Sequence, residues 1–221
     1  MWRTLCCVFG LIGLMVLAAP AQARHHRARA DSDATAGAFD YYLLSLSWAP
    51  TYCLGHTGDG AECGSKGYGF VVHGLWPQFD QGGYPENCST SYQLTSEAQA
   101  QGRTIYPSQG LMQHEWREHG TCSGLDAVSY FRTVDRATAV VRTPPALETP
   151  QTMQTLSAGQ IVDLFRRANP QLASDGLVVA CSRDDLSEIR VCVTKDLALR
   201  SCGRGIHSSC PSGAVAIPAS R

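Results

Sequence analysis

Cysteine content is the feature of this 221-residue chain that most constrains its fold. Ten cysteines are present, and eight of them follow residue 50, at positions 53, 63, 88, 122, 181, 192, 202 and 210. An even number of cysteines in this pattern indicates a disulfide framework formed in an oxidising compartment. A zinc cluster is disfavoured, because none of the eight forms a Cys-x-x-Cys pair. The sequence alone leaves the disulfide pairing open.

The first 23 residues, which hold the other two cysteines, have the pattern of a secretory signal. A basic residue at Arg3 precedes an apolar run from Leu5 to Ala19, and Ala21-Gln22-Ala23 is a small-residue cleavage site. The run has about 15 residues, whereas a membrane-spanning helix needs about 20. We therefore expect a cleaved signal peptide at residues 1–23 and a secreted or periplasmic protein, with a membrane anchor as the alternative.

Residues 24–38 are small or charged and show no periodicity, which predicts a disordered leader. Residues 39–221 are expected to form a single domain, because no repeat or Pro/Ser-rich linker divides them. No segment after the signal is apolar enough to span a bilayer, so we expect the mature protein to make no membrane contact.

Hydrophobic patterning predicts the main elements of this domain. The expected elements are a strand over 40–48, a polar Gly-rich loop over 51–69, helices over 111–119 and 126–141, a helix capped by Ser157 and stopped at Asn169-Pro170, and a hairpin over 177–181 and 188–194. Because strands and helices do not alternate regularly, the pattern indicates an α+β fold.

The segment from His114 to His119 gathers two imidazoles and two carboxylates, the groups that acid/base chemistry near neutral pH requires. On a helix of about 3.6 residues per turn, Glu115 and His119 lie on one face and His114 and Glu118 form a second pair. A solvated helix face with i,i+4 pairs is the alternative interpretation. A zinc site is less favoured, because the histidines are five residues apart and diverge by about 140°.

A second candidate is His73, which follows the apolar run Phe70-Val71-Val72 and precedes Gly74 and Pro77. This pattern predicts a buried strand that stops abruptly, with His73 at its end. A histidine there and another on a helix would place a proton donor and an acceptor on opposite sides of a substrate. The alternative is a core histidine satisfied by the backbone.

The two segments together, His73 to Pro77 and His114 to Cys122, resemble the two active-site segments of the ribonuclease T2 family, in that family's order and approximate spacing. The resemblance extends to Phe39–Cys53 and to Leu186–Cys192 and covers roughly residues 39 to 196. It implies a disulfide-stabilised α+β fold, with helices packed on a central antiparallel β-sheet.

The resemblance also implies a chemistry: RNA is cleaved by attack of its own 2′-OH, through a 2′,3′-cyclic phosphate to a 3′-phosphate, without a cofactor or metal. His119 would be the general base and His73 the general acid. His114 would hold the phosphate, and Glu115 would stabilise the transition state or orient His119. Nucleobase contacts would come from Trp76, Gln78 and Tyr84. DNA, which lacks the 2′-OH, would not be a substrate, and a monomer is expected.

The resemblance has one departure, because the family usually has lysine where this chain has Glu118. A lysine would offset phosphate charge in the transition state, whereas Glu118 would instead pair with His114. This leaves a catalytically weakened RNA-binding protein as the alternative function, with a metal-dependent hydrolase less favoured. Removal of the signal leaves 17 basic and 19 acidic side chains, too few positive charges for tight polyanion binding.

Proximity in the sequence and the family resemblance together suggest a disulfide pairing. The expected bonds are Cys53–Cys63, Cys88–Cys122 and Cys181–Cys192, which leaves Cys202–Cys210. The Cys88–Cys122 bond would tie the loop after His73 to the end of the helix that carries His119.

Overall fold

The computed structural model describes residues 35–220, so the expected signal peptide at residues 1–23 lies outside the described residues. The strands are β1 (Tyr41–Trp48), β2 (Phe70–Gln78), β3 (Gln154–Ser157), β4 (Leu177–Ser182), β5 (Asp185–Val193) and β6 (Ala214–Ile217). The helices are α1 (Ala49–Gly55), α2 (Ser96–Gly102), α3 (Gln109–Glu118), α4 (Ala127–Val140) and α5 (Ala158–Ala168). Two short 3-10 helices are η1 (Gly120–Ser123) and η2 (Pro145–Leu147).

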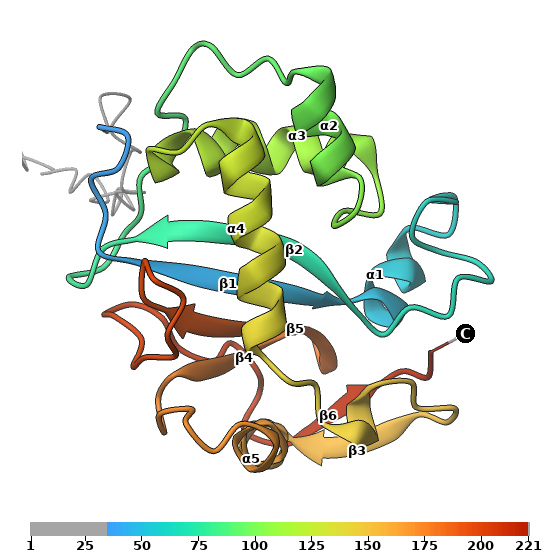
Figure 1. Ribbon diagram of the computed structural model, residues 1–221. Helices are drawn as coiled ribbons and strands as arrows, with labels where there is room; N and C mark the ends of the chain where they lie inside the picture. Colours follow the sequence, from blue (N-terminus) through green and yellow to red (C-terminus); the bar gives the residue numbers. More distant parts are fainter. Residues whose placement is uncertain (1–34, 221) are drawn as a thin grey trace, which may run out of the picture.

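One sheet organises the molecule, with strand order β2-β1-β5-β6-β3 and β4 paired to β5. The pairings are antiparallel except for a single parallel bridge between β5 and β6. In Figure 1, α4 crosses in front of the sheet, while α2 and α3 lie above β2 and α5 lies below, beside β3. The predicted α+β class with an antiparallel sheet is confirmed.

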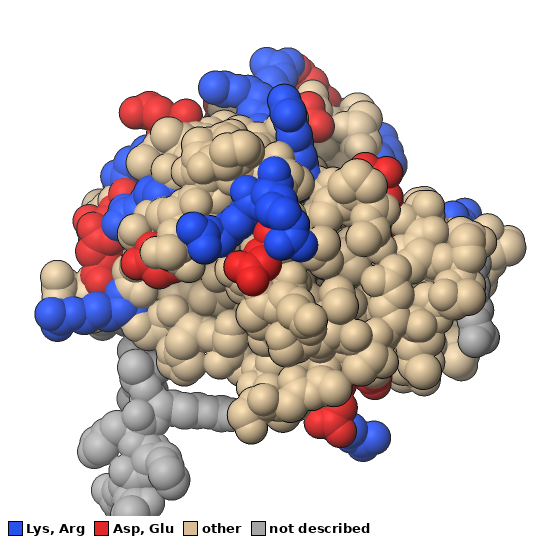
Figure 2. Space-filling view, turned by 90° about the horizontal axis from the view of Figure 1, so that it is seen from below, with Lys and Arg blue, Asp and Glu red and all other residues tan. Residues whose placement is uncertain are grey.

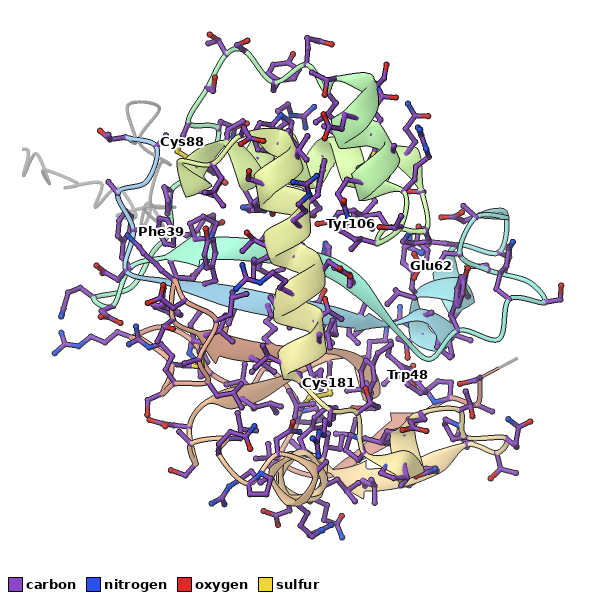
Figure 3. All side chains as sticks on the ribbon, in the orientation of Figure 1. Phe39, Trp48, Glu62, Cys88, Tyr106 and Cys181 are labelled. Atoms are coloured by element: carbon purple, nitrogen blue, oxygen red, sulfur yellow. A yellow bond between two sulfur atoms is a disulfide. The ribbon has the colours of Figure 1, made fainter. Side chains whose placement is uncertain are left out.

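The two faces of β1 enter different clusters. Tyr42, Leu44, Leu46 and Trp48 point into the main core, where they join side chains of α3, α4 and α5. Phe39 and Tyr106, labelled in Figure 3, belong to the same core. Tyr41 and Leu43 face the other side and pack with Cys192 in a smaller cluster. On this second face Leu43 and Trp76 also line a cavity.

His73 lies inside β2 rather than at its end, so the expected strand terminus is wrong. The strand continues to Gln78 because β2 is the edge of the sheet, where a proline such as Pro77 is tolerated. Ser45 pairs with Gly74 and Leu46 pairs with Val72, which leaves His73 as the extra residue of a β-bulge. A bulge of this kind re-aims a side chain, and here it brings His73 onto the same face as Trp76.

The expected helix starts at Asp126 and Ser157 are confirmed, whereas α3 begins two residues before the expected Leu111. Ser108, Asp126 and Ser157 each cap a helix with the side chain, and Ser157 forms a full capping box with Gln160. The expected loop over 51–69 is wrong at its start, because residues 49–55 form α1 with Pro50 in the first turn. Strands β3 and β6 and helix α2 were not anticipated.

The end of the expected leader is ordered, contrary to the sequence interpretation. Within the described residues 35–38, the Gly37 amide donates to the Cys122 carbonyl, and Lys195 donates to the Gly37 carbonyl. These contacts fix the entry to β1 against the end of α3. No helix among residues 35–220 is both long and apolar enough to cross a membrane.

Four disulfides form among residues 35–220, and two of them correct the expected pairing. Cys53–Cys63 and Cys88–Cys122 are confirmed, and the sulfur of Cys88 is visible beside η1 in Figure 3. The other two are Cys181–Cys210 and Cys192–Cys202, in place of the expected Cys181–Cys192 and Cys202–Cys210.

The register of the β4–β5 hairpin explains the correction. Cys181 lies opposite Leu186, whereas Cys192 bonds through its amide to Gly176. Five residues separate Cys181 from Gly176, so at about 3.3 Å per residue the two cysteines lie about 17 Å apart along the hairpin, well beyond the roughly 7 Å that a disulfide can bridge. The C-terminal segment instead runs back along the hairpin and bonds to each strand in turn.

Candidate active site

Four of the expected site residues meet around one indole ring. The ring centroid of Trp76 lies 5.0 Å from that of His73 and 5.2 Å from that of His119. The Trp76 indole N–H donates to Glu115 Oε2 at 2.7 Å, and Glu115 Oε1 lies 3.6 Å from His73 Nε2. The two imidazoles therefore flank Trp76, with the Glu115 carboxylate beside both Trp76 and His73.

Gly74 is what allows this close packing. A Cβ on Gly74 would overlap the Glu115 carboxylate and the Trp76 indole nitrogen. Glu115 itself is fully buried, held between α3 and the edge strand. The absence of a side chain at position 74 thus lets a buried carboxylate from a helix reach the bulged strand.

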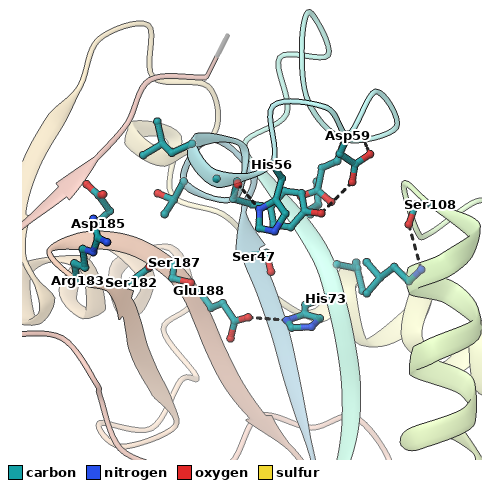
Figure 4. Close-up of a pocket in the computed structure, with 18 residues that line it drawn as sticks. Ser47, His56, Asp59, His73, Ser108, Ser182, Arg183, Asp185, Ser187 and Glu188 are labelled. Carbon is teal, nitrogen blue, oxygen red and sulfur yellow. Dashed lines mark hydrogen bonds and ion pairs between the residues drawn. The ribbon is translucent and has the colours of Figure 1, made fainter.

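A fifth residue, Glu188, belongs to the site and was missed by sequence reasoning. Its Oε1 lies 2.6 Å from His73 Nδ1, a contact drawn as a dashed line in Figure 4. Its Oε2 accepts from Ser45 Oγ at 3.0 Å and from Arg190 Nε at 2.8 Å. The alternation of Glu188 and Arg190 with buried Ile189 and Val191 could have suggested that the two charges share a face, but not that β1 and β2 lie beside them.

Buried charges set the protonation of this cluster. Burial alone would lower the pKa of His73, but the hydrogen bond and charge of Glu188, together with the charge of Glu115, outweigh burial and raise it. Burial raises the pKa of Glu115 to about 7, against the opposing effects of His73 and Trp76. The pKa of Glu188 is lowered to about 2, because its contacts with His73 and Arg190 outweigh its burial. These contacts therefore stabilise the protonated form of His73 beside an ionised Glu188.

His119 has the opposite character. It lies at the C-cap of α3, where its backbone N–H donates to the Glu115 carbonyl. Its Nδ1 is buried without a hydrogen-bond partner among the described residues. Burial lowers its pKa to about 4, with Glu118 opposing and the charges of His114 and His73 adding to the effect. His119 is therefore a neutral imidazole across most of the pH range.

Two cavities open on the two sides of this cluster. One, of about 430 Å³, is lined by His119 together with all three residues expected to contact a base, Trp76, Gln78 and Tyr84. Arg190 and Arg204 complete its wall. The other, of about 530 Å³, is lined by His73 and Glu188 and by a stacked Tyr52–His56 pair whose ring centroids are 4.0 Å apart (Figure 4).

His114 does not join the cluster. Its Nδ1 lies 3.6 Å from Glu118 Oε1, as expected, but Arg117 Nη2 binds the same oxygen at 2.9 Å. Residues 114, 117 and 118 thus form the solvated set of pairs that was the alternative interpretation, whereas Glu115 and His119 turn inward. Among the described residues, no three or more His, Cys, Asp or Glu side chains are grouped so that they could hold a metal ion.

The charge on one face of the molecule is mixed. Figure 2 shows lysine and arginine side chains next to acidic ones, beside a broad uncharged region.

Comparison with known proteins gives a consistent result. Residues 39–202 match the model of the Ribonuclease T2 family. A ribonuclease of Aeromonas hydrophila is 49% identical over 90 residues, which cover 41% of this chain and 40% of that protein. A probable ribonuclease of Haemophilus influenzae is 30% identical over 178 residues, which cover 74% of this chain and 61% of that protein. The chain thus spans less than two thirds of the length of either relative.

A solved structure shares the fold. The RNase-related protein from Calystegia sepium matches with a TM-score of 0.65 at 24% identity, over 83% of this chain and 98% of that chain. At this level of identity the likeness establishes the architecture, a helix-covered antiparallel sheet with the same overall arrangement.

Proposed function

Because this chain belongs to the ribonuclease T2 family, we propose that it is an endoribonuclease that cleaves single-stranded RNA by internal transesterification. One observation carries the proposal: His73, whose Nδ1 is paired with a carboxylate, and His119, whose Nδ1 has no partner within residues 35–220, flank the same indole ring. Such a pair supplies a proton donor and a proton acceptor at the same pH.

In the proposed first step, neutral His119 removes the proton from a ribose 2′-OH. The freed oxygen attacks the adjacent phosphorus, and protonated His73 gives its Nε2 proton to the departing 5′ oxygen. The products are a 2′,3′-cyclic phosphate and a free 5′-OH. In the second step the roles reverse, so that His73 activates a water and His119 protonates the 2′ oxygen, which leaves a 3′-phosphate.

The two cavities give the substrate a direction. The nucleoside that carries the attacking 2′-OH would occupy the cavity beside His119, where Trp76 and Tyr84 offer stacking surfaces and Gln78 hydrogen-bonding groups. Stacking of a base on an aromatic side chain contributes about 1–3 kcal/mol. The departing nucleoside would lie on the other side of Trp76, in the cavity that His73 lines.

Charge on the phosphate would be met by Glu115, acting as a hydrogen-bond donor when protonated. The expected phosphate contact of His114 is not part of the proposal, because His114 lies outside the cluster and is paired with Glu118. Glu118 occupies the position where the family usually has lysine, but its carboxylate is bound by Arg117, which offsets its negative charge. This departure favours the second candidate function, a catalytically weakened RNA-binding protein. Release of a cyclic phosphate from RNA separates the two candidates.

The decisive experiment uses His73→Ala and His119→Ala, with exposed His207→Ala as the matched control. Each proton-transfer group is commonly worth about 10²–10⁴ in rate, so both site variants should lose at least about a hundredfold in turnover. Cleavage of a dinucleotide series is followed in excess chelator, and the end groups are identified. Losses below about tenfold in both variants, or activity that disappears with chelator, would contradict the assignment.

Export to an oxidising compartment, periplasmic or extracellular, is part of the proposal. Its support is the pairing of all eight cysteines of the described residues into four disulfides. Fractionation of the producing cells tests it, because the protein should be found outside the cytoplasm and without residues 1–23.

A further inference from the structure

We propose that Glu188 is the positioning residue of His73: it holds the Nδ1 proton, so that Nε2 carries the proton facing the cleft. This inference rests on the proposed function, in which His73 is the general acid, and it adds a residue that the two active-site segments do not contain. Glu188 lies on β5, 115 residues after His73.

The contact itself specifies the tautomer. A carboxylate oxygen 2.6 Å from Nδ1 accepts a hydrogen bond and cannot donate one when ionised. Nδ1 therefore keeps its hydrogen whether the ring is charged or neutral, and Nε2 is the nitrogen that gains and loses the exchangeable proton. Nε2 faces Glu115, at 3.6 Å, which is the side where the reacting phosphate is proposed to lie.

Glu188 is itself fixed, as a positioning residue must be. It is 8% exposed, and its second oxygen accepts from Ser45 Oγ and from both Nε and Nη2 of Arg190. His73, Ser45 and Glu188 come from the three adjacent strands β2, β1 and β5. The Glu188 carboxylate therefore links the bulge of the edge strand to the centre of the sheet. Rotation of the His73 imidazole would break its charge-assisted hydrogen bond to Glu188.

Other charged groups also face His73, and their effects on its pKa must be distinguished from the effect of Glu188. Glu115 approaches from α3, Arg190 from β5, Glu62 from the loop after α1, and His119 from the end of α3. Glu62 provides a matched control, because it is a buried carboxylate that lines the same cavity and acts on His73 by charge without touching it.

The test compares Glu188→Gln, Glu62→Gln and Arg190→Gln by NMR titration of the His73 ring nitrogens, with no RNA present. Glu188→Gln preserves shape but removes the charge, so the pKa of His73 should fall by at least about one unit, with a smaller shift in Glu62→Gln. Arg190→Gln removes the opposing cation and should shift the pKa of His73 upward. General loosening of the fold cannot make the pKa of His73 fall in Glu188→Gln and rise in Arg190→Gln.

Cleavage kinetics give the functional readout. In Glu188→Gln the alkaline limb of the kcat/KM profile should shift to lower pH, together with the titration of His73, while the acidic limb stays at the same pH. An unchanged His73 titration and tautomer in Glu188→Gln overturns the proposal. A shifted titration with an unmoved limb also overturns it, because His73 would then not be the acid. Absence of cleavage by the unaltered protein would instead reject the proposed function while leaving the Nδ1–Glu188 contact measurable.

Discussion

Substitution of Gly74 by alanine places a methyl group where the buried centre of the site has no room. The added Cβ would overlap both the Glu115 carboxylate and the Trp76 indole nitrogen. These two groups are joined by a 2.7 Å hydrogen bond and are anchored on different elements, α3 and β2. Neither can retreat without moving a buried backbone segment, so we expect their hydrogen bond to break.

The size of the effect follows from two contributions. Insertion of a methyl group into a packed interior costs about 1–3 kcal/mol, and loss of a hydrogen bond to a buried carboxylate costs about 1–3 kcal/mol more. The free energy of unfolding should therefore fall by about 2–6 kcal/mol. Displacement of Glu115 and Trp76 by even 1 Å should lower kcat/KM by about a hundredfold.

Gly110 provides the matched control for this prediction. It lies in the first turn of α3, and a Cβ added there meets no atom within 4 Å. Gly110→Ala should leave cleavage unchanged and raise stability by up to about 1 kcal/mol, the difference in helix propensity between the two residues. Urea unfolding and dinucleotide cleavage are measured for both variants at one pH.

The reasoning fails if Gly74→Ala unfolds at the same urea concentration as the unaltered protein and cleaves within twofold of its rate. That result would mean that the edge strand can shift outward and absorb the methyl group.

Two further predictions concern the pH dependence and the disulfides. The profile of kcat/KM against pH should be bell-shaped. It should rise as His119 loses its proton near pH 4, and it should fall above the pKa of His73, which is raised beyond its usual value of about 6.5. A kcat/KM that still rises at pH 8 would contradict the assignment of acid and base. The double substitution of Cys88 and Cys122 by serine should lower the free energy of unfolding by roughly 2–4 kcal/mol. It should also reduce cleavage, because the Cys88–Cys122 disulfide holds the loop carrying Tyr84 against the end of α3. The equivalent change at Cys53 and Cys63 serves as the comparison, and an equal loss of cleavage in both pairs would contradict a special role for the first.

Patterns with a local cause were readable from the sequence. Ser157 and Asp126 mark helix starts because a side-chain oxygen satisfies a backbone N–H within three residues. The i,i+4 relation between Glu115 and His119 placed both on the inward side of α3. The strand over 40–48 and the β4–β5 hairpin were also recognised from composition and alternation.

Features that depend on the order of strands in the sheet could not be predicted from the sequence. Glu188 meets His73 only because β1 lies between β2 and β5, and no local pattern encodes that neighbourhood. The disulfides of Cys181 and Cys192 depend on the path of the C-terminal segment, which has little regular structure. Gly74 and Pro77 were taken as the stop of a strand, but β2 is an edge strand, where a proline is tolerated, so His73 was wrongly placed at a strand end.

The segment between Cys202 and Cys210 has a consequence for how this protein could be altered. It forms neither helix nor strand, yet both ends are covalently held by β5 and β4. Its residues Arg204, Gly205 and Ile206 line the cavity that Trp76 and His119 also line. Transplanting this stretch from a relative, with its two cysteines kept, would exchange part of the cavity wall and leave His73 on β2 and His119 at the end of α3 unchanged. One wall of this cavity can therefore be altered separately from the sheet and α3, because it lies in a loop held at both ends by disulfides.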